Sequence, residues 1–474
     1  MTTMYIPTAL SYDDVLLVPK KSAIKSRHDV KMNTQLTKNI SLKIPIVSAN
    51  MDTVTESTMA IAMALEGGIG IIHRFCDISS QVHEVKKVKR KQNIVIGNPF
   101  TINTKATLAE FKERSTELGC SSFLVSDDGR ELLGIITRRD VVFCGDDSTL
   151  VKNIMTPKDK LIVGSINIST DDAKKMLREN KIEKLPLVDE DFQIKGLITE
   201  KDIMRNSNNV QASKDKLGRL LVGAAVGVRG DYLERAVALT EAGVDVLVLD
   251  IAHGHSDNAI EAIKVIKRAL PNMEVIGGNI ATAQGALDLI EAGVDGVKVG
   301  IGPGSICTTR ITTGFGVPQL SAILNIAPVC KKYGVPLVAD GGIKQSADLV
   351  KALAAGADTV MMGGQLSGTE ESPGPAINYK GRQYKISRGM ASLTAALSRP
   401  DSKEKHHQIT PEGIEARVPY KGPVKNIIAR YLGGLKSGMS YGNAKTISEL
   451  KECQFIRITN SGMRESDSHD NEVL

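Results

Sequence analysis

Short apolar runs, each followed by a stretch with apolar residues at helical spacing, recur along most of this 474-residue chain. Such runs are typical of strands that are buried on both faces, and the stretches between them are typical of helices, several of which end at a glycine. This alternation of strand and helix predicts a parallel α/β fold. The apolar runs cover residues 43–50, 220–227, 244–250, 273–279, 294–300, 335–340 and 357–364.

The number of these units suits a (β/α)8 TIM barrel, in which the chemistry lies at the carboxyl ends of the strands. A doubly wound sheet would produce the same alternation. However, no GxGxxG motif opens a first strand–helix unit, which weakens that alternative. We therefore predict a barrel formed by residues 1–93 and 214–474.

Residues 94–208 interrupt the alternation with an internal repeat. The segment ELLGIITRRDVV (131–142) resembles QIKGLITEKDIM (193–204), and each follows a short apolar run. Each copy predicts a strand, a turn, a second strand and a helix that begins near ITxxD. A duplicated small module, 94–150 and 151–208, is therefore predicted as an insertion in the barrel domain.

The composition excludes several classes of protein. No apolar run is long enough to span a membrane, and the N-terminus lacks a signal-peptide pattern, so a cytoplasmic protein is expected. Aromatic residues make up 4% and Trp is absent, which argues against stacking platforms for nucleic acid. Six scattered cysteines without a CxxC pair argue for reduced thiols and against a disulfide framework or a zinc site.

Glycines gather where the predicted strands end. Exposed backbone N–H groups without side chains in the way form concavities that suit phosphate. One such pair would be an ordinary tight turn, but several loops at one mouth favour a ligand that carries phosphate. These glycines are Gly300, Gly302, Gly304, Gly341, Gly342, Gly363 and Gly364.

Cys307 lies in one of these loops, in VKVGIGPGSICTTRITTGFG (297–316). A structural cysteine is normally surrounded by apolar residues, whereas this one is flanked by glycine, small hydroxyl residues and Arg310. A nearby cation and backbone N–H dipoles favour the thiolate. Cys307 is therefore predicted to be a nucleophile, and the other five cysteines to be structural.

The chain resembles the IMP dehydrogenase and GMP reductase family over essentially its whole length. The similarity is carried by SANMDTVTE, GGNIATAQGA, VKVGIGPGSICTTR, GTEESPG and PEGIEARVPYKG, in the family's order. It also identifies the duplicated insertion as a pair of CBS modules, which in such enzymes bind adenine or guanine nucleotides and regulate.

The resemblance implies a role for each matching residue. Cys307 would attack C2 of a purine nucleoside monophosphate, with Thr309 and Glu371 relaying a proton. The 5′-phosphate would be held by Ser305, Gly342, Gly363 and Gly364, the ribose by Asp340, and the base by Gly389 and Met390. Asp250 would contact the nicotinamide ribose of NAD(H) or NADP(H). Carbonyl groups of Gly302, Gly304 and Cys307 would bind a monovalent cation, expected to be K⁺, and Glu465 and Ser466 of a neighbouring subunit of a homotetramer would complete that site.

The segment 398–414 bears on which family reaction applies. Family dehydrogenases carry an Arg-Tyr pair on a mobile flap before PEGI, and its arginine activates water. Here the segment reads SRPDSKEKHHQITPEGI, without that pair, and the nearest substitutes are Lys405 and His406. Lysine lacks the planar fork of arginine and is a poor equivalent.

Three hypotheses follow. A GMP reductase that bears CBS modules is favoured, because the water-activating pair is absent. An IMP dehydrogenase with a divergent flap is the alternative, since EESPG, ARVPYKG and the CBS pair favour dehydrogenases. A catalytically idle nucleotide sensor is the third, opposed by the complete set of Cys307, Asp250 and Asp340.

Overall fold

The computed structural model describes residues 6–91, 95–97, 99–142, 144–166, 168–207, 211–398 and 410–466. The chain divides into two compact units. One comprises Met1–Lys89, Gln211–Ser213 and Leu220–Leu474, and the other comprises Arg90–Val210 and Lys214–Arg219.

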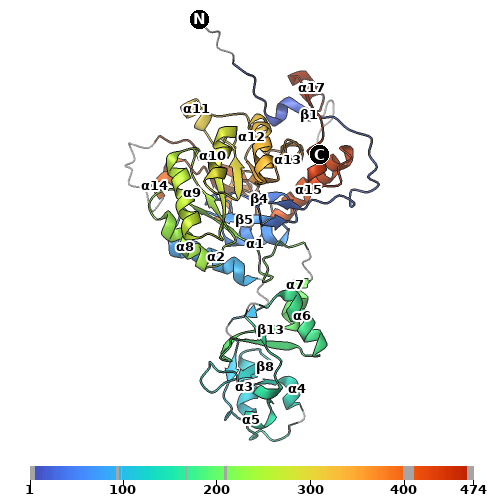
Figure 1. Ribbon diagram of the computed structural model, residues 1–474, viewed down its shortest axis with the longest axis vertical. Helices are drawn as coiled ribbons and strands as arrows, with labels where there is room; N and C mark the ends of the chain where they lie inside the picture. Colours follow the sequence, from blue (N-terminus) through green and yellow to red (C-terminus); the bar gives the residue numbers. More distant parts are fainter. Residues whose placement is uncertain are drawn as a thin grey trace. The chain divides into compact units, whose positions relative to one another are not determined.

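The larger unit is a closed barrel of eight parallel strands, as predicted (Figure 1). Going round the barrel, the order is β14, β15, β16, β17, β18, β19, β4 and β5. The strands are β4 (Ile46–Ser48), β5 (Ile69–Ile72), β14 (Gly223–Val226), β15 (Val246–Leu249), β16 (Glu274–Ile280), β17 (Gly296–Val299), β18 (Leu337–Asp340) and β19 (Thr359–Met362). Seven of these lie in the apolar runs that predicted them, and β5 was not predicted.

One principal helix follows each barrel strand and covers its outer face. These helices are α1 (Ser57–Leu65), α2 (Ile78–Lys91), α8 (Tyr232–Glu241), α9 (Asp257–Ala269), α10 (Ala283–Glu291), α12 (Gln319–Tyr333), α13 (Ser346–Ala354) and α15 (Val424–Tyr441). The smaller unit is inserted after α2, between the second and third strand–helix pairs.

Two apolar layers stabilise the barrel. Side chains such as Val47, Ile71, Val248 and Val338 fill its interior, and a larger set packs between the strands and the helices. Because both faces of each strand are buried, the strand sequences are mostly apolar and do not alternate.

Shorter elements surround the barrel. Near the termini, β1 (Val15–Leu17) follows a 3₁₀ turn (Tyr12–Asp14) and pairs with β23 (Phe455–Arg457), and β2 (Thr34–Gln35) pairs with β3 (Ser41–Leu42). Beyond β19, an antiparallel sheet contains β20 (Ile377–Tyr379), β21 (Arg382–Arg388) and β22 (Glu415–Pro419). The remaining helices are α11 (Thr309–Thr313), α14 (Leu393–Ser398), α16 (Ile447–Leu450) and α17 (Asn460–Arg464).

The smaller unit contains two four-stranded sheets. The first has β7 (Thr101–Ile102), β8 (Ser122–Val125), β9 (Gly134–Thr137) and β10 (Thr156–Pro157), with α3 (Leu108–Glu117), α4 (Arg138–Val141) and α5 (Val151–Ile154). The second has β6 (Val95–Ile96), β11 (Gly164–Ser165), β12 (Lys184–Val188) and β13 (Ile194–Thr199), with α6 (Thr170–Glu179) and α7 (Glu200–Ser207). In each copy of the repeat a hairpin leads into a helix that starts at ITxxD.

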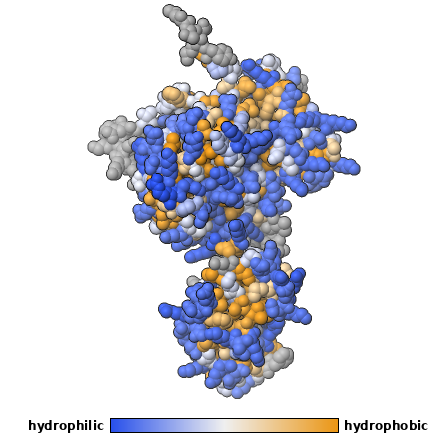
Figure 2. All heavy atoms as spheres, in the orientation of Figure 1, coloured by the Kyte–Doolittle hydropathy of each residue, from blue (hydrophilic) through white to orange (hydrophobic). Residues whose placement is uncertain are grey.

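The two copies of the repeat share an apolar contact. Leu124 and Ile135 of the first copy pack with Val188 and Leu197 of the second. Apolar side chains also reach the surface of this unit around β8 and β13, whereas the visible face of the barrel unit is largely hydrophilic (Figure 2). None of the helices in the described ranges combines the length and the apolar composition needed to cross a membrane.

Helix α15 contains two adjacent glycines whose surroundings differ, which gives a test of the packing of α15 on α13. A Cβ atom on Gly434 would lie 2.3 Å from Cβ of Ser346, whereas nothing lies within 4 Å of a Cβ atom on Gly433. Gly434→Ala should therefore lower the free energy of unfolding by about 1–3 kcal/mol. Gly433→Ala should raise it by up to about 1 kcal/mol, because alanine favours helix. Urea denaturation followed by circular dichroism measures both, and equal effects would contradict the close packing at Gly434.

Candidate active site

The loop after β17 carries the predicted nucleophile. It runs from Gly300 to Thr308 and leads into α11. Gly302 has φ of +80°, and a Cβ atom there would lie 2.6 Å from Cγ of Arg310. Arg310 in turn donates hydrogen bonds to the carbonyls of Ile301 (3.1 Å) and Val317 (2.6 Å). The arginine therefore folds the loop around itself, and only glycine leaves room for it.

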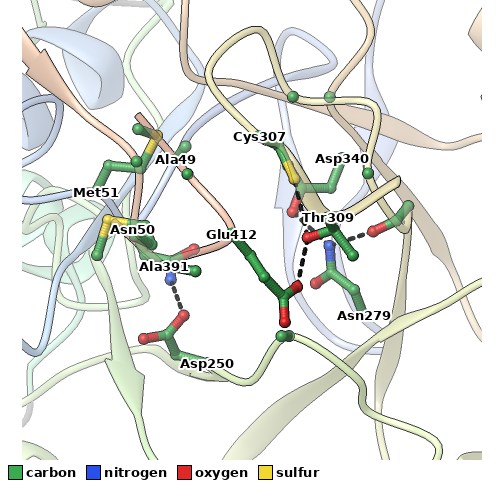
Figure 3. A pocket seen from close by; sticks show the side chains of 18 of the residues that line it. Ala49, Asn50, Met51, Asp250, Asn279, Cys307, Thr309, Asp340, Ala391 and Glu412 are labelled. Atoms are coloured by element: carbon green, nitrogen blue, oxygen red, sulfur yellow. Dashed lines mark hydrogen bonds between the residues drawn. The ribbon is translucent and has the colours of Figure 1, made fainter. Parts of the chain in front are cut away.

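Three side chains form a hydrogen-bonded chain that starts in this loop (Figure 3). The Cys307 thiol donates to Oγ1 of Thr309 at 3.2 Å. The Thr309 hydroxyl donates to Oε2 of Glu412 at 2.7 Å. A proton on sulfur therefore has a two-step route to a carboxylate, and Arg310 lies within electrostatic reach of the thiolate that would remain.

Backbone contacts hold Glu412 next to the loop. The amide of Thr308 donates to the carbonyl of Glu412 (2.8 Å), and the amide of Ile414 donates to the carbonyl of Ile306 (3.0 Å). Between them, Cys307 and Gly413 form an isolated antiparallel bridge. The sequence analysis did not identify Glu412, although it quoted the PEGI segment that contains it.

The structure corrects the predicted pairing of Thr309 with Glu371. The Glu371 carboxylate accepts a hydrogen bond from the amide of Val424 (2.8 Å), at the first residue of α15. A carboxylate at a helix N-terminus satisfies a free N–H group and interacts favourably with the helix dipole. Glu371 therefore holds a helix end, and Glu412 makes the contact with Thr309.

Asp250 follows β15 and is clamped by two side chains. Nε of Arg74 donates to Oδ2 of Asp250 at 2.8 Å, and Nδ2 of Asn50 donates to Oδ1 at 3.0 Å. The side chains of Arg74 and Asp250 are only 9% and 17% exposed. Their mutual attraction is therefore weakly screened, and it fixes the direction of the carboxylate.

Asp340, the last residue of β18, is held in the same manner. Nζ of Lys298 lies 2.8 Å from Oδ2 of Asp340, and Nδ2 of Asn279 donates to the same oxygen at 2.9 Å. Lys298 also donates to Oδ1 of Asn279. Three consecutive strands, β16, β17 and β18, supply this cluster.

A cavity of about 290 Å³ opens between these groups. It is lined by many of the predicted site residues, namely Asp250, Gly302, Gly304, Cys307, Thr309, Asp340, Gly389 and Met390, and by Glu412. Ser305, Gly342, Gly363, Gly364 and Glu371 are not among its lining residues. The cavity is therefore a compartment with one thiol, a proton relay and two clamped carboxylates on its walls.

The residues predicted to hold phosphate lie in loops next to the cavity. The Ser305 hydroxyl lies 2.5 Å from the position that a Cβ atom on Gly364 would take, so these two residues are in contact. Gly363 faces the sulfur of Met51, and Gly342, with φ of +81°, faces the ring of Tyr12. A side chain at Gly364 would displace the Ser305 hydroxyl.

The predicted cation ligands are the backbone carbonyls of Gly302, Gly304 and Cys307, with Glu465 and Ser466 of a neighbouring subunit. The Gly304 carbonyl accepts a hydrogen bond from the amide of Cys307 (3.1 Å). Glu465 and Ser466 are exposed just beyond α17. Across the described residues no three His, Cys, Asp or Glu side chains are arranged to hold a metal ion. Lys405 and His406 lie outside the described residues.

Thiol reactivity separates Cys307 from two of the other cysteines. Burial raises the pKa of Cys76 to about 11 and that of Cys330 to about 12. Because the thiolate is the reacting form, both should be nearly inert towards iodoacetamide at pH 8. We expect Cys307, which is half-buried in the cavity wall, to be alkylated at least about tenfold faster, as mapped by peptide mass spectrometry. Earlier labelling of Cys76 or Cys330 would contradict this assignment, and a Cys307→Ala variant is the control.

Comparison with known proteins agrees with this geometry. A family model described as IMP dehydrogenase / GMP reductase domain matches residues 9–469. The inosine-5′-monophosphate dehydrogenase of Nitrosopumilus maritimus is 50% identical over 475 residues, which cover 98% of this chain and 99% of that protein. The GMP reductase of Leishmania major is 46% identical over 480 residues, covering 98% and 97%.

Among solved structures, a cysteine-to-alanine variant of GMP reductase from Trypanosoma brucei in complex with guanosine 5′-monophosphate superposes with a TM-score of 0.83. It is 46% identical, and the match covers 98% of this chain and 99% of that one. The match of the family model and these identities over nearly full length lead to one conclusion: the chain belongs to the IMP dehydrogenase / GMP reductase family of oxidoreductases.

Proposed function

We propose that this protein is a GMP reductase, which converts GMP and NADPH to IMP, ammonia and NADP⁺. The hydrogen-bonded chain from Cys307 through Thr309 to Glu412 supports this reaction most directly. Expelling ammonia requires both a nucleophile and a proton donor for the leaving nitrogen, and this chain supplies the two together.

The proton relay can serve each proton transfer that the proposed reductase reaction requires at C2. The thiol proton of Cys307 passes through Thr309 to Glu412, and the thiolate forms a C–S bond to C2 of the guanine ring. The proton then returns through Thr309 to the amino group on C2, and the C–N bond breaks as ammonia leaves. The bound nicotinamide supplies a hydride to C2. The C–S bonding electrons return to sulfur, IMP is released, and the thiolate takes a proton from solvent.

The two clamped carboxylates fit a pair of nucleotides. Asp340 would accept hydrogen bonds from the ribose hydroxyls of the purine nucleotide, and Asp250 from those of the nicotinamide nucleotide. Each is ion-paired, to Lys298 and Arg74 respectively, and its oxygens accept hydrogen bonds. The two hydroxyl groups of a ribose are hydrogen-bond donors that match such acceptors.

The sequence of the flap favours reduction over oxidation. The dehydrogenase reaction must end with water attacking the C2–sulfur adduct, and the family's Arg-Tyr pair for that step is absent between 398 and 414. The reductase needs no such base, because the hydride itself releases the thiolate.

IMP dehydrogenase is the second candidate. It is supported by the 50% identity to the dehydrogenase of Nitrosopumilus maritimus, which slightly exceeds the 46% identity to the GMP reductase of Leishmania major. In this reading Thr309 and Glu412 would remove a proton from water, since the same chain of hydrogen bonds can carry a proton towards the carboxylate.

One assay separates the two candidates. Purified protein with GMP and NADPH should lose absorbance at 340 nm and release one ammonia per NADPH consumed. Protein with IMP and NAD⁺ should give no NADH. The opposite pattern would identify a dehydrogenase, and an absence of both reactions would revive the idle nucleotide sensor.

The two glutamates provide a matched pair for the relay. Glu412→Gln removes the carboxylate that accepts the proton, so kcat should fall by about 10²- to 10⁴-fold while the KM for GMP stays within a few fold. Glu371→Gln alters only a contact at the start of α15 and should change stability more than kcat. Steady-state kinetics with thermal unfolding measures both, and an equal loss of kcat in the two variants would contradict the assignment of Glu412.

We also propose that the duplicated insertion is a CBS pair that binds a regulatory adenine or guanine nucleotide. Its support is the repeat itself, since both copies form a hairpin and a helix and share an apolar contact. Assembly into a homotetramer, with Glu465 and Ser466 reaching the neighbouring subunit, is part of the same proposal.

A further inference from the structure

A lysine lies behind the loop that is proposed to hold the 5′-phosphate. Nζ of Lys421 donates to the carbonyl of Gly364 at 2.7 Å and to the carbonyl of Gln365 at 3.1 Å. Lys421 follows β22 by two residues, and its own amide donates to the carbonyl of Gly368 (2.9 Å). The ammonium and the backbone of one residue therefore fix two parts of the loop.

These contacts set the direction of the loop's amide groups. The carbonyl of Gly364 and the amide of Gln365 belong to one planar peptide unit and point in opposite directions. A cation on the carbonyl side therefore turns the N–H away from Lys421 and makes it a stronger donor, because hydrogen bonds in series polarise one another. Within the described part of the chain, the amides of Gly364 and Gln365 donate no hydrogen bond to another protein group. Ser305, which contacts Gly364, adds a hydroxyl at the same place.

No carboxylate of the described residues is paired with the charge of Lys421. Both of its acceptors are neutral carbonyls. Burial, with a smaller contribution from Arg430, lowers the pKa of Lys421 to about 8. Burying a cation without an anion is costly, and an anion bound at the loop would offset that cost.

We propose that Lys421 is a positioning residue for the 5′-phosphate of the purine nucleotide: its ammonium orients the amide of Gln365 and supplies the half-buried positive charge that the phosphate neutralises. This inference rests on the proposed function only in taking a nucleoside monophosphate as substrate. Both the reductase and the dehydrogenase reaction satisfy it.

Affinities of the full-length protein test the proposal. Isothermal titration would measure the Kd of GMP, and of guanosine, which lacks the phosphate. Lys421→Met should raise the Kd of GMP by roughly 10- to 100-fold, the loss expected for a hydrogen-bonding charged group, and leave the Kd of guanosine unchanged. Lys421→Arg, which keeps a cation, should restore most of the GMP affinity. Lys425→Met, on the exposed face of α15, is the matched control and should affect neither ligand.

The pH dependence of the unmodified protein gives a second readout that needs no variant. The charged groups around the loop are Arg430 on α15, Lys385 on β21, and Glu370 and Glu371 on the loop itself. Lys421 is cationic below its pKa of about 8 and neutral above it. The ratio of GMP to guanosine affinity should therefore fall between pH 7 and pH 9, where the phosphate is already a dianion. In Lys421→Arg the ratio should stay flat.

The outcomes are distinguishable. A Lys421→Met protein that loses GMP and guanosine affinity equally, or that keeps both, would overturn the positioning role, as would a flat pH profile in the unmodified protein. Failure of the proposed reaction would appear instead in the unmodified protein, as turnover of IMP with NAD⁺ alongside intact GMP binding. An unmodified protein that binds no monophosphate would overturn both.

Discussion

The backbone hydrogen bonds between the loop after β17 and the segment that leads into β22 hold the reacting groups together. Thr308 and Ile414 donate to Glu412 and Ile306 across this contact, and Cys307 pairs with Gly413. The nucleophile lies on a barrel loop, whereas its proton acceptor lies in an excursion from the barrel more than a hundred residues later in the sequence. This short antiparallel contact brings the Thr309 hydroxyl within 2.7 Å of Glu412.

The barrel was predictable because its physical cause is local. A strand that is buried on both faces must be largely apolar, and a helix that covers it must have apolar side chains along one face. Seven strands could therefore be predicted from the sequence. Strand β5 was not found because it is short and begins within LEGGIGIIHR, where glycines indicate a turn. Gly70 is required for packing and does not mark a turn. A Cβ atom on Gly70 would lie 2.5 Å from Cα of Ala60, so glycine lets α1 pack directly on the strand.

The site was predictable only where a barrel rule applies. Asp250, Asp340 and Cys307 follow strand ends, so the fold alone places them at one mouth. Glu412 follows no barrel strand, and its position depends on a pairing between distant segments that no local pattern encodes. Glu371 was chosen by motif, and its carboxylate accepts a hydrogen bond from the amide of Val424, which lies 53 residues later in the sequence. The carboxylate that contacts Thr309 belongs to Glu412.

The two carboxylate clusters are built alike, which suits the proposed binding of two nucleotides in one cavity. Asp250 is held by a cation and an amide, Arg74 and Asn50, and Asp340 by Lys298 and Asn279. The first cluster comes from residues that follow β4, β5 and β15, and the second from β16, β17 and β18, so they lie on different parts of the closed rim.

Each clamp leaves lone pairs on its carboxylate, since a carboxylate can accept about four hydrogen bonds. Asp340 lies near Cys307, and Asp250 lies beyond Glu412 (Figure 3). In the proposed reaction these two acceptors would contact the two riboses, with the sulfur of Cys307 within the same cavity. A hydride transfer at C2 needs two rings to lie face to face over that sulfur. Fixing each ring through its own ribose removes the orientational freedom that would otherwise oppose the transfer. In the proposed reaction the paired clamps would therefore fix the two reactants, a task that the thiol alone does not require.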